Sequence, residues 1–382
     1  MNDNYSMKRL FLLLLILIQI KVLVFAEPMY SPTWGFFLDL PEGYEFTEGD
    51  GKNRFSFSGP AGLKFDLVVY DGRYESIQDL VINVNKNISN RGDTDFFMYK
   101  DKRAAIMELL FDNYTGYGLC IELAPAGAPN PGTMMVALSY GPANLKGMDI
   151  FHFSALDSIA PSVSERLCPG PVMHYSFPRG ELKNITLVDE IPAMIYENDA
   201  EAAQVLVERE YAVLAAYIET EYVQAAWRRY YRFVFRDSFD RIINPAFALV
   251  SAWGGSGAKT TESKRAFAQK TLNFVQGFTY ERNPNGSDFL NLVTAIIEKR
   301  GDCDSRAMLW AVILTCAEIR AAMMVSFHYS HALGLADIEG QGARFEAFGV
   351  RWLVAETTAN VNLGLIAEDV SDPKYWIGIV FE

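Results

Sequence analysis

Basic residues are in the minority in this chain and are nowhere concentrated. The 382 residues include 34 Lys and Arg against 47 Asp and Glu, which gives a net charge of −13. Nucleic acids and anionic membrane surfaces attract proteins through clustered positive charge, which this sequence does not offer. We therefore exclude nucleic acid from the expected partners.

Motifs for metals and phosphate groups are also missing. Only four histidines are present, and His152 and His174 stand alone, without cysteine or aspartate at metal-ligand spacing. The glycine-rich segment 254–257 is followed by Lys259-Thr260, which falls at the wrong spacing for a phosphate-binding loop. We expect no metal ion and no cofactor.

The N-terminal apolar run is too short to span a membrane. Lys8 and Arg9 precede the run Leu10–Ile18, and Lys21 interrupts the apolar character soon after. A spanning helix needs roughly 20 apolar residues, whereas a basic start, a short apolar stretch and a small final residue are typical of a signal peptide. We interpret residues 1–26 as a signal peptide, which predicts export to the periplasm or the extracellular space. An uncleaved N-terminal anchor is the alternative.

The remaining residues suffice for two globular domains. Half of the chain is hydrophobic and 13% is aromatic, as in ordinary globular proteins, and domains usually take ~100–200 residues each. The boundaries that we predict are 27–170 for an N-terminal domain, 171–257 for a mainly helical connector and 258–382 for a C-terminal domain.

The N-terminal domain shows short alternating apolar runs such as Phe36–Leu40, Leu63–Tyr70 and Met134–Tyr140, which predict strands of an antiparallel sheet. Helical spacing over 76–87 and 144–159 makes this an α+β domain.

In the connector, the spacing predicts one long helix from Asp199 to about Phe235. Its many aromatic residues are assigned to packing within the core or between domains, with a binding groove as the alternative.

The four cysteines invite a disulfide interpretation in an exported protein. Cys120 and Cys168 are the pair that we consider, because both lie in the N-terminal half. Cys303 and Cys316 cannot pair if they share one helix, since about 20 Å along the helix axis would separate them. At least one of these two should remain a thiol.

The C-terminal domain is predicted to begin with helices over 263–277 and 287–299, the second ended by Gly301. Asp302 can cap a third helix, which starts at Cys303 and continues through the apolar series Ala307–Leu314. Such a helix must be buried on most sides. Free backbone N–H groups and the helix dipole in the first turn favour a thiolate at Cys303.

Two carboxylates flank that cysteine. Asp302 and Asp304 could suggest a cation site, but a helix cap and a dipole partner are the simpler interpretation.

Two strand-like segments follow, over 322–336 and 351–358, rich in apolar, aromatic and β-branched residues. The order of cysteine helix, histidine strand and acid strand resembles the transglutaminase-like superfamily over about residues 260–360, in particular its bacterial cysteine peptidase branch. The resemblance implies a papain/transglutaminase-like α+β domain. It also implies roles for four residues: Cys303 as nucleophile, His331 as base, Glu356 as orienting acid and Gln276 as side-chain donor of the oxyanion hole.

The sequence departs from the family pattern in places. Leu333 stands where many members have an aromatic residue, so the wall on the substrate side is expected to differ, and Glu356 replaces the commoner aspartate. His328 is a rival base, expected on the opposite strand face because it lies an odd number of residues from His331. Cys316 fits a small buried residue without reactivity.

These features predict an exported cysteine-dependent acyl-transfer enzyme that acts on peptide or amide bonds of a protein or peptide substrate through a thioester. Hydrolysis is favoured over transamidation because it needs only water as acceptor. The alternative is a non-catalytic binding or scaffolding protein of the cell envelope, built on the same fold.

Overall fold

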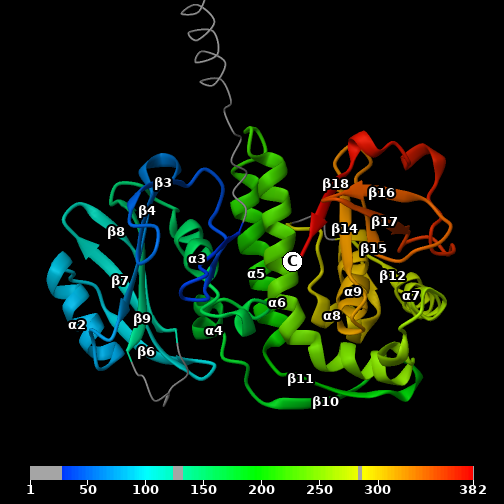
Figure 1. The fold of residues 1–382 in the computed structure, drawn as a ribbon, viewed down its shortest axis with the longest axis horizontal. Helices are drawn as coiled ribbons and strands as arrows, with labels where there is room; N and C mark the ends of the chain where they lie inside the picture. The colour runs from blue at the N-terminus through cyan, green and yellow to red at the C-terminus, as the bar shows by residue number, and fades with distance from the viewer. Residues whose placement is uncertain (1–27, 124–131, 283–285, 382) are drawn as a thin grey trace, which may run out of the picture.

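The computed structural model describes residues 28–123, 132–282 and 286–381. As the sequence predicts, the fold is α+β. A seven-stranded sheet and a five-stranded sheet lie on either side of two long helices (Figure 1). The predicted signal peptide, residues 1–26, falls outside the described residues. Within those residues, no helix is long and apolar enough to cross a membrane.

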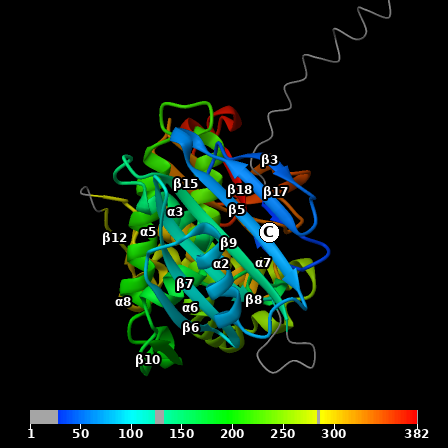
Figure 2. The ribbon, with the colours of Figure 1, turned by 90° about the vertical axis from the view of Figure 1, so that its left-hand side faces the viewer.

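The N-terminal sheet is antiparallel throughout, with strand order β3-β4-β5-β9-β8-β7-β6. Helix α2 covers one face, in front of the strands in Figure 2, and α3 packs on the other face. The bounds of these elements are β3 Glu45–Gly49, β4 Arg54–Ser58, β5 Lys64–Asp71, α2 Ile77–Ile88, β6 Thr94–Tyr99, β7 Lys102–Phe111, β8 Tyr114–Glu122, β9 Thr133–Pro142 and α3 Asp149–Asp157.

Smaller elements complete this half of the molecule. They are β1 Met29–Tyr30, β2 Phe37–Leu38, α4 Pro171–Ser176, β10 Leu182–Thr186 and β11 Pro192–Tyr196. Strand β10 forms an antiparallel hairpin with β11 below the long helices (Figure 1).

The predicted helix over 76–87 is confirmed, because Ser76 caps α2 through the backbone N–H of Asp79. The predicted helix over 144–159 is shorter than expected. Gly147 takes a positive φ of 74°, so the regular turns of α3 start only after it.

The Cys120–Cys168 disulfide that we considered does not form in the structure, where both residues are free thiols. Cys120 points from β8 toward α2 and is packed between the sheet and that helix. Cys168 instead lies near α6, with its Sγ 3.6 Å from Oδ1 of Asp240. A disulfide needs Cβ atoms roughly 3.5–4.5 Å apart, and the two side chains have different surroundings.

The expected single helix of the connector is two helices, α5 Asp199–Ala215 and α6 Val223–Ala252. The chain turns between them over 216–222, where Tyr217 donates its hydroxyl proton to the carbonyl of Glu42 at 2.9 Å. This long-range contact with the N-terminal half holds the turn, and no proline or glycine marks it in the sequence.

A buried ion pair between α6 and α5 is also hydrogen-bonded to the N-terminal half. Arg229, only 3% exposed, donates to Glu210 at 2.9 Å, to the Ser154 hydroxyl at 2.9 Å and to the Asp39 carbonyl at 2.7 Å. Because a buried charge without partners is costly, these contacts fix how the helices sit against α3.

The C-terminal sheet is also antiparallel, with strand order β16-β17-β15-β14-β18. The elements of this half are α7 Thr261–Gln276, β12 Thr279–Tyr280, α8 Leu292–Glu298, β13 Arg300–Gly301, α9 Cys303–Cys316, β14 Ala321–Ser326, β15 His331–Ala336, β16 Arg344–Ala347, β17 Val350–Ala355 and β18 Ile377–Val380.

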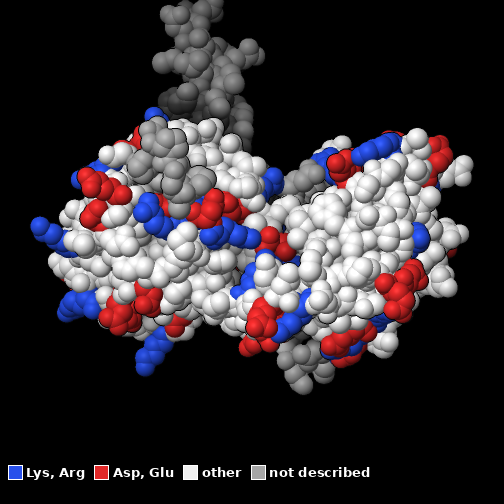
Figure 3. Space-filling model, turned by 90° about the horizontal axis from the view of Figure 1, so that it is seen from below, with Lys and Arg blue, Asp and Glu red and all other residues white. Residues whose placement is uncertain are grey.

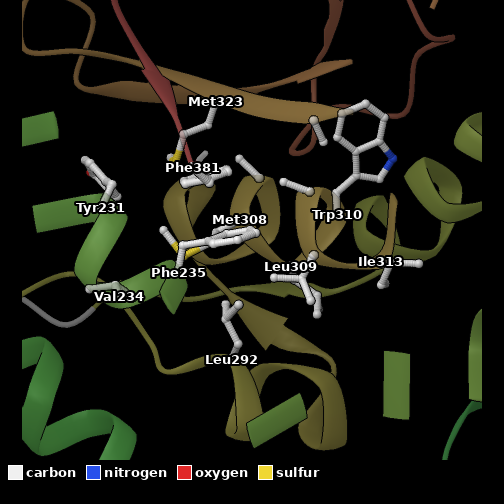
Figure 4. Packing of buried hydrophobic residues seen from close by; sticks show 14 of the residues in the cluster. Tyr231, Val234, Phe235, Leu292, Met308, Leu309, Trp310, Ile313, Met323 and Phe381 are labelled. Atoms are coloured by element: carbon white, nitrogen blue, oxygen red, sulfur yellow. The ribbon is translucent and has the colours of Figure 1, made fainter. Parts of the chain in front are cut away.

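Helix α9 is buried on all sides, as its uniformly apolar sequence predicts. It lies between the sheet on one side and α6 and α8 on the other (Figure 4). Trp310 is fully buried and donates its indole N–H to the Ala268 carbonyl at 3.1 Å. At Gly334 the sheet comes so close that a Cβ would lie 2.6 Å from the Trp310 ring. The core therefore fixes the position of α9, and with it the position of Cys303.

Three local predictions in this half are wrong. The helix expected over 287–299 begins only at Leu292, because Asn291 caps it through the N–H of Thr294. That helix ends with Lys299 in the left-handed conformation, at φ 53°, and not at Gly301. The single strand expected over 322–336 is a hairpin of β14 and β15, with its turn at 327–330.

On the face seen from below, acidic and basic side chains are interspersed and no continuous basic area appears (Figure 3).

Candidate active site

Cys303 is the first residue of α9, as the sequence predicts. Asp302 caps the helix by accepting from the backbone N–H of Ser305 at 2.8 Å. Gly301 takes a φ of 154°, and a Cβ there would lie 3.1 Å from Cβ of Ser305. The Gly-Asp-Cys order therefore has a structural reason: the glycine lets the chain enter the helix and the aspartate holds its first turn.

His331 and Glu356 are in direct contact. The Nε2 atom of His331, the first residue of β15, lies 2.8 Å from Oε2 of Glu356, which directly follows β17. The backbone N–H and the hydroxyl of Thr358 both donate to the other carboxylate oxygen at 2.7 Å. Because a carboxylate only accepts, Nε2 carries a proton and Nδ1 is left for another partner.

The strands that carry these residues pair antiparallel, with Gly334 opposite Ala355. The chain between these two strands forms β16, which pairs with the other edge of β17.

Cys303 and His331 line one cavity of about 240 Å³. The thiol is 5% exposed and accepts a hydrogen bond from the backbone N–H of Ala332, the residue after His331. It also lies 3.8 Å from Oδ1 of Asp304. Three of the four predicted site residues, Cys303, His331 and Glu356, thus meet at one end of the C-terminal sheet.

The electrostatics of the thiol differ from the expectation. Burial raises the pKa of the Cys303 thiol above its ordinary value, and the carboxylates of Asp304 and Asp302 raise it further. The pKa values of these two carboxyl groups are also raised, first by their own burial. These effects oppose the stabilisation of a thiolate by the helix N-terminus, and a nearby cation would offset the carboxylates.

The acid beside His331 behaves in the opposite way. Burial would raise the pKa of Glu356, but the hydrogen bonds from His331 and Thr358 outweigh burial and hold this pKa below its ordinary value. Glu356 is therefore ionised at neutral pH.

Gln276 is the last residue of α7 and contacts the acid strand. Its Nε2 donates to the carbonyl of Glu356 at 2.8 Å and to that of Val361 at 2.9 Å. Both amide protons are thus in use, and Gln276 can donate to an oxyanion only if one of these bonds is released. Its Oε1 is buried without a partner.

The remaining residues that the sequence singled out lie away from the cavity. His328 is exposed in the β14–β15 turn and stacks on Tyr375, with ring centroids 3.9 Å apart. Cys316 ends α9, where burial raises its pKa to about 12. Leu333 is fully buried in a cluster with Trp352, so it forms no wall of the cavity.

Most of the aromatic rings in the cavity wall come from the connector, whose aromatic residues the sequence assigned to packing. Trp227, Tyr230 and Tyr231 of α6 and Tyr211 of α5 line the cavity together with Phe327 of the β14–β15 turn. The aromatic content of the connector was the available signal. Nothing in the sequence showed which of these rings face Cys303.

Two further residues near the thiol were also missed. Tyr280 of β12 lies within hydrogen-bonding reach of the Cys303 side chain, because β12 pairs with β13 just before α9. Arg306 is 1% exposed and donates to the carbonyls of Gly301 and Phe278 at 3.1 and 2.8 Å. It thereby holds these two short strands against the helix start.

Asp302 and Asp304 do not form a metal site with a third residue. In the part of the chain that the structure describes, no group of three or more His, Cys, Asp or Glu side chains is arranged to hold a metal ion. The interpretation of Asp302 as a helix cap is confirmed.

Comparisons with known proteins add little to this geometry. No protein-family model matches the chain, and no curated protein is significantly similar to it. Among solved structures, the chain is similar to calcium-bound LapG of Legionella pneumophila, at 14% identity and a TM-score of 0.22, covering 41% of this chain and 76% of that chain. A likeness with so low a TM-score carries no argument about the site, so any assignment depends on the residues themselves.

Proposed function

We propose that this protein is an exported cysteine-dependent acyl-transfer enzyme of the transglutaminase-like type, acting on peptide or amide bonds. The observation that carries the proposal is the hydrogen bond of 2.8 Å between His331 and Glu356, beside a cavity that Cys303 also lines. Nucleophile, base and orienting acid are the parts that such chemistry requires.

In the proposed reaction, the imidazole of His331 takes the proton of the Cys303 thiol through its free Nδ1. The thiolate attacks the carbonyl carbon of the substrate amide, and the imidazolium protonates the departing amine. This leaves a thioester on Cys303, which an acceptor such as water then cleaves to release the acid and restore the thiol. Glu356 stabilises the imidazolium and fixes its tautomer throughout.

The developing oxyanion needs donors in this mechanism. The backbone N–H of Cys303, free in the first turn of α9, is one such donor. Gln276 is a site residue of the proposal in either of two ways, as an oxyanion donor after releasing one of its bonds or as the side chain that holds the Glu356 backbone. Gln276→Met removes both roles without adding charge. A fall in kcat with an unchanged free energy of unfolding supports the oxyanion role, whereas a fall in both quantities supports the role of holding the Glu356 backbone.

One observation favours the non-catalytic alternative. Burial and two carboxylates raise the pKa of the Cys303 thiol, which disfavours the reactive form when no imidazolium forms. A binding or scaffolding role would need no thiolate at all.

Trapping the thioester tests the proposal. The purified protein is incubated with a proteome-derived peptide library, with and without hydroxylamine, and the products are identified by mass spectrometry. The proposal predicts new carboxyl termini in water and hydroxamates with hydroxylamine, and neither with Cys303→Ala. A primary amine added as acceptor then distinguishes hydrolysis from transamidation. Absence of both product classes would support the non-catalytic alternative.

A further inference from the structure

The cavity beside Cys303 has an uneven distribution of charge. Three acidic residues line it, namely Asp288, Asp302 and Asp304. Among its described lining residues, Arg282 carries the one guanidinium group, and its Nε lies 3.1 Å from Oδ2 of Asp288. Even after this pair is discounted, two carboxyl groups face the cavity, and the imidazole of His331 is the remaining basic side chain among its described lining residues. The site is therefore poorly suited to an acidic group.

Asp302 has a buried polar atom without a partner. The residue is 1% exposed, and its Oδ1 accepts from the Ser305 backbone while Oδ2 has no hydrogen-bond partner. A buried carboxyl oxygen without a partner costs stability unless a ligand satisfies it. Because burial raises the pKa of Asp302 to about 8, a bound cation would also favour the ionised form of this group. Because Asp302 lines the cavity, a donor placed there could supply the missing bond.

The cavity also has an aromatic wall, and Tyr231 of this wall is hydrogen-bonded to Asp304. Trp227 stacks on Tyr231 with ring centroids 5.5 Å apart and meets Phe327 edge-on at 4.5 Å. Its indole Nε1 is also buried without a partner. Aromatic faces combined with carboxylates attract cations, both through the ring quadrupole and through direct charge.

The size of the cavity limits the ligand. At about 240 Å³ it is smaller than typical ligand pockets of ~300–1,000 Å³. It suits a single long side chain better than an oligosaccharide or a lipid.

We infer that this cavity is a specificity subsite for a cationic side chain of the substrate, lysine or arginine, seated between the α6 aromatic wall and the carboxylates of Asp302 and Asp304. The inference rests on the proposed function and names its substrate class. The bound cation also offsets the two carboxylates beside the Cys303 thiol, so a basic substrate favours formation of the thiolate that attacks it. Specificity and activation are thus coupled at one place.

Methanethiosulfonate reagents of similar size and different charge test this inference directly. The thiolate of Cys303 attacks the reagent sulfur, a disulfide forms and methanesulfinate leaves. The ethyltrimethylammonium reagent is cationic, the ethylsulfonate reagent is anionic, and the methyl reagent is neutral. Rates at Cys303 are followed by mass spectrometry of its peptide and divided by the rates with free 2-mercaptoethanol.

We expect the normalised ratio of the cationic to the anionic rate to be about ten or more in the wild type. It should fall by on the order of tenfold in Asp304→Asn and in Asp302→Asn. Asparagine caps helices as well as aspartate, so the start of α9 should persist in the second variant. Arg282→Gln removes positive charge from an exposed position, 48% exposed, and should raise the ratio. Asp337→Asn, just past the other end of β15, is the matched control and should leave it unchanged.

The outcomes separate the two proposals. The cationic subsite alone is overturned if the rate ratio is near unity and neither Asp304→Asn nor Arg282→Gln changes it, while labelling of Cys303 still depends on His331. Slow labelling by all three reagents that His331→Ala does not change overturns the proposed function as well. The trimethylammonium group has no N–H and cannot be acylated. Faster labelling by this reagent therefore reports binding of a cationic group and not of an amine that accepts the acyl group.

Discussion

The imidazole of His331 donates from Nε2 to Oε2 of Glu356 over 2.8 Å, and Thr358 holds the other carboxylate oxygen with two bonds of 2.7 Å. A histidine fixed in this way presents Nδ1 in a defined direction. The charged carboxylate also stabilises the imidazolium that forms when the thiol gives up its proton.

Replacing Glu356 by glutamine should therefore impair the reaction more than the fold. We expect kcat to fall by on the order of 10²–10⁴-fold, because the amide no longer stabilises the imidazolium or fixes its tautomer. The measurement is the turnover of a peptide identified by product analysis, with Glu346→Gln at an exposed position as control. A loss of less than about threefold would contradict the role of Glu356.

The same carboxyl group gives a pH dependence of stability. Its pKa is lower in the folded protein than in the unfolded chain, so the stability it contributes is present above the unfolded pKa, ~4.3. That contribution is lost as pH falls through the folded pKa. The difference in free energy of unfolding between the wild type and Glu356→Gln should therefore shrink below about pH 4, measured by urea denaturation. A constant difference across this range would argue against the assigned shift.

The carboxyl group of Asp304 should give stability the opposite pH dependence. Burial raises the pKa of its carboxyl group in the folded state, so the folded protein holds this proton to a higher pH than the unfolded chain does. Stability is then lost as pH rises from about 4 through the folded pKa. Asp304→Asn removes this loss, and its free energy of unfolding relative to wild type should increase between pH 4 and pH 8. Parallel pH profiles for the two proteins would refute the shift.

Gly301 tests the geometry of the helix start. Alanine at its φ of 154° is strained, and the added Cβ would lie 3.1 Å from Cβ of Ser305. We expect Gly301→Ala to lower the free energy of unfolding by about 1–3 kcal/mol. Gly257→Ala is the matched control, since nothing lies within 4 Å of the position of its Cβ. Equal effects at the two positions would show that the conformation of Gly301 is not required.

Arg229 tests how the connector is joined to the N-terminal half. Arg229→Met removes one of the two guanidinium partners of buried Glu210, which keeps Arg209, and it also removes the bonds to Ser154 and Asp39. We expect a loss of about 2–3 kcal/mol in the free energy of unfolding. The control is Arg351→Met, which breaks an ion pair whose two side chains are each 74% exposed and should cost under about 1 kcal/mol. If both variants lose the same amount, the buried network does not hold the two halves together.

The sequence predicted those parts of the site that depend on local pattern. The Gly301-Asp302-Cys303 order and the uniformly apolar helix after it were enough to place the cysteine at a buried helix start. The β14–β15 turn was missed because Phe327 to Ser330 contains neither glycine nor proline, although Ser330 adopts a positive φ of 48°.

The aromatic wall and the state of the thiol could not be predicted in the same way. Trp227 and Tyr231 reach the cavity only because α6 packs against α9, a contact between segments far apart in the chain. Likewise, the pKa of Cys303 is raised first by burial of the thiol itself and then by Asp304 and Asp302, and the local sequence does not predict how deeply the thiol is buried.

The central claim, that His331 activates Cys303, is tested most directly by the rate of Cys303 alkylation with iodoacetamide between pH 5.5 and pH 8. Burial and the flanking carboxylates make a lone thiol slow in this range, so fast labelling requires proton transfer to His331. We predict that the folded wild type reacts faster at pH 6 than the same thiol in urea, and that His331→Ala loses this advantage by at least about tenfold. Equal rates in wild type and His331→Ala, or a folded protein slower than the unfolded chain at every pH, would contradict the claim.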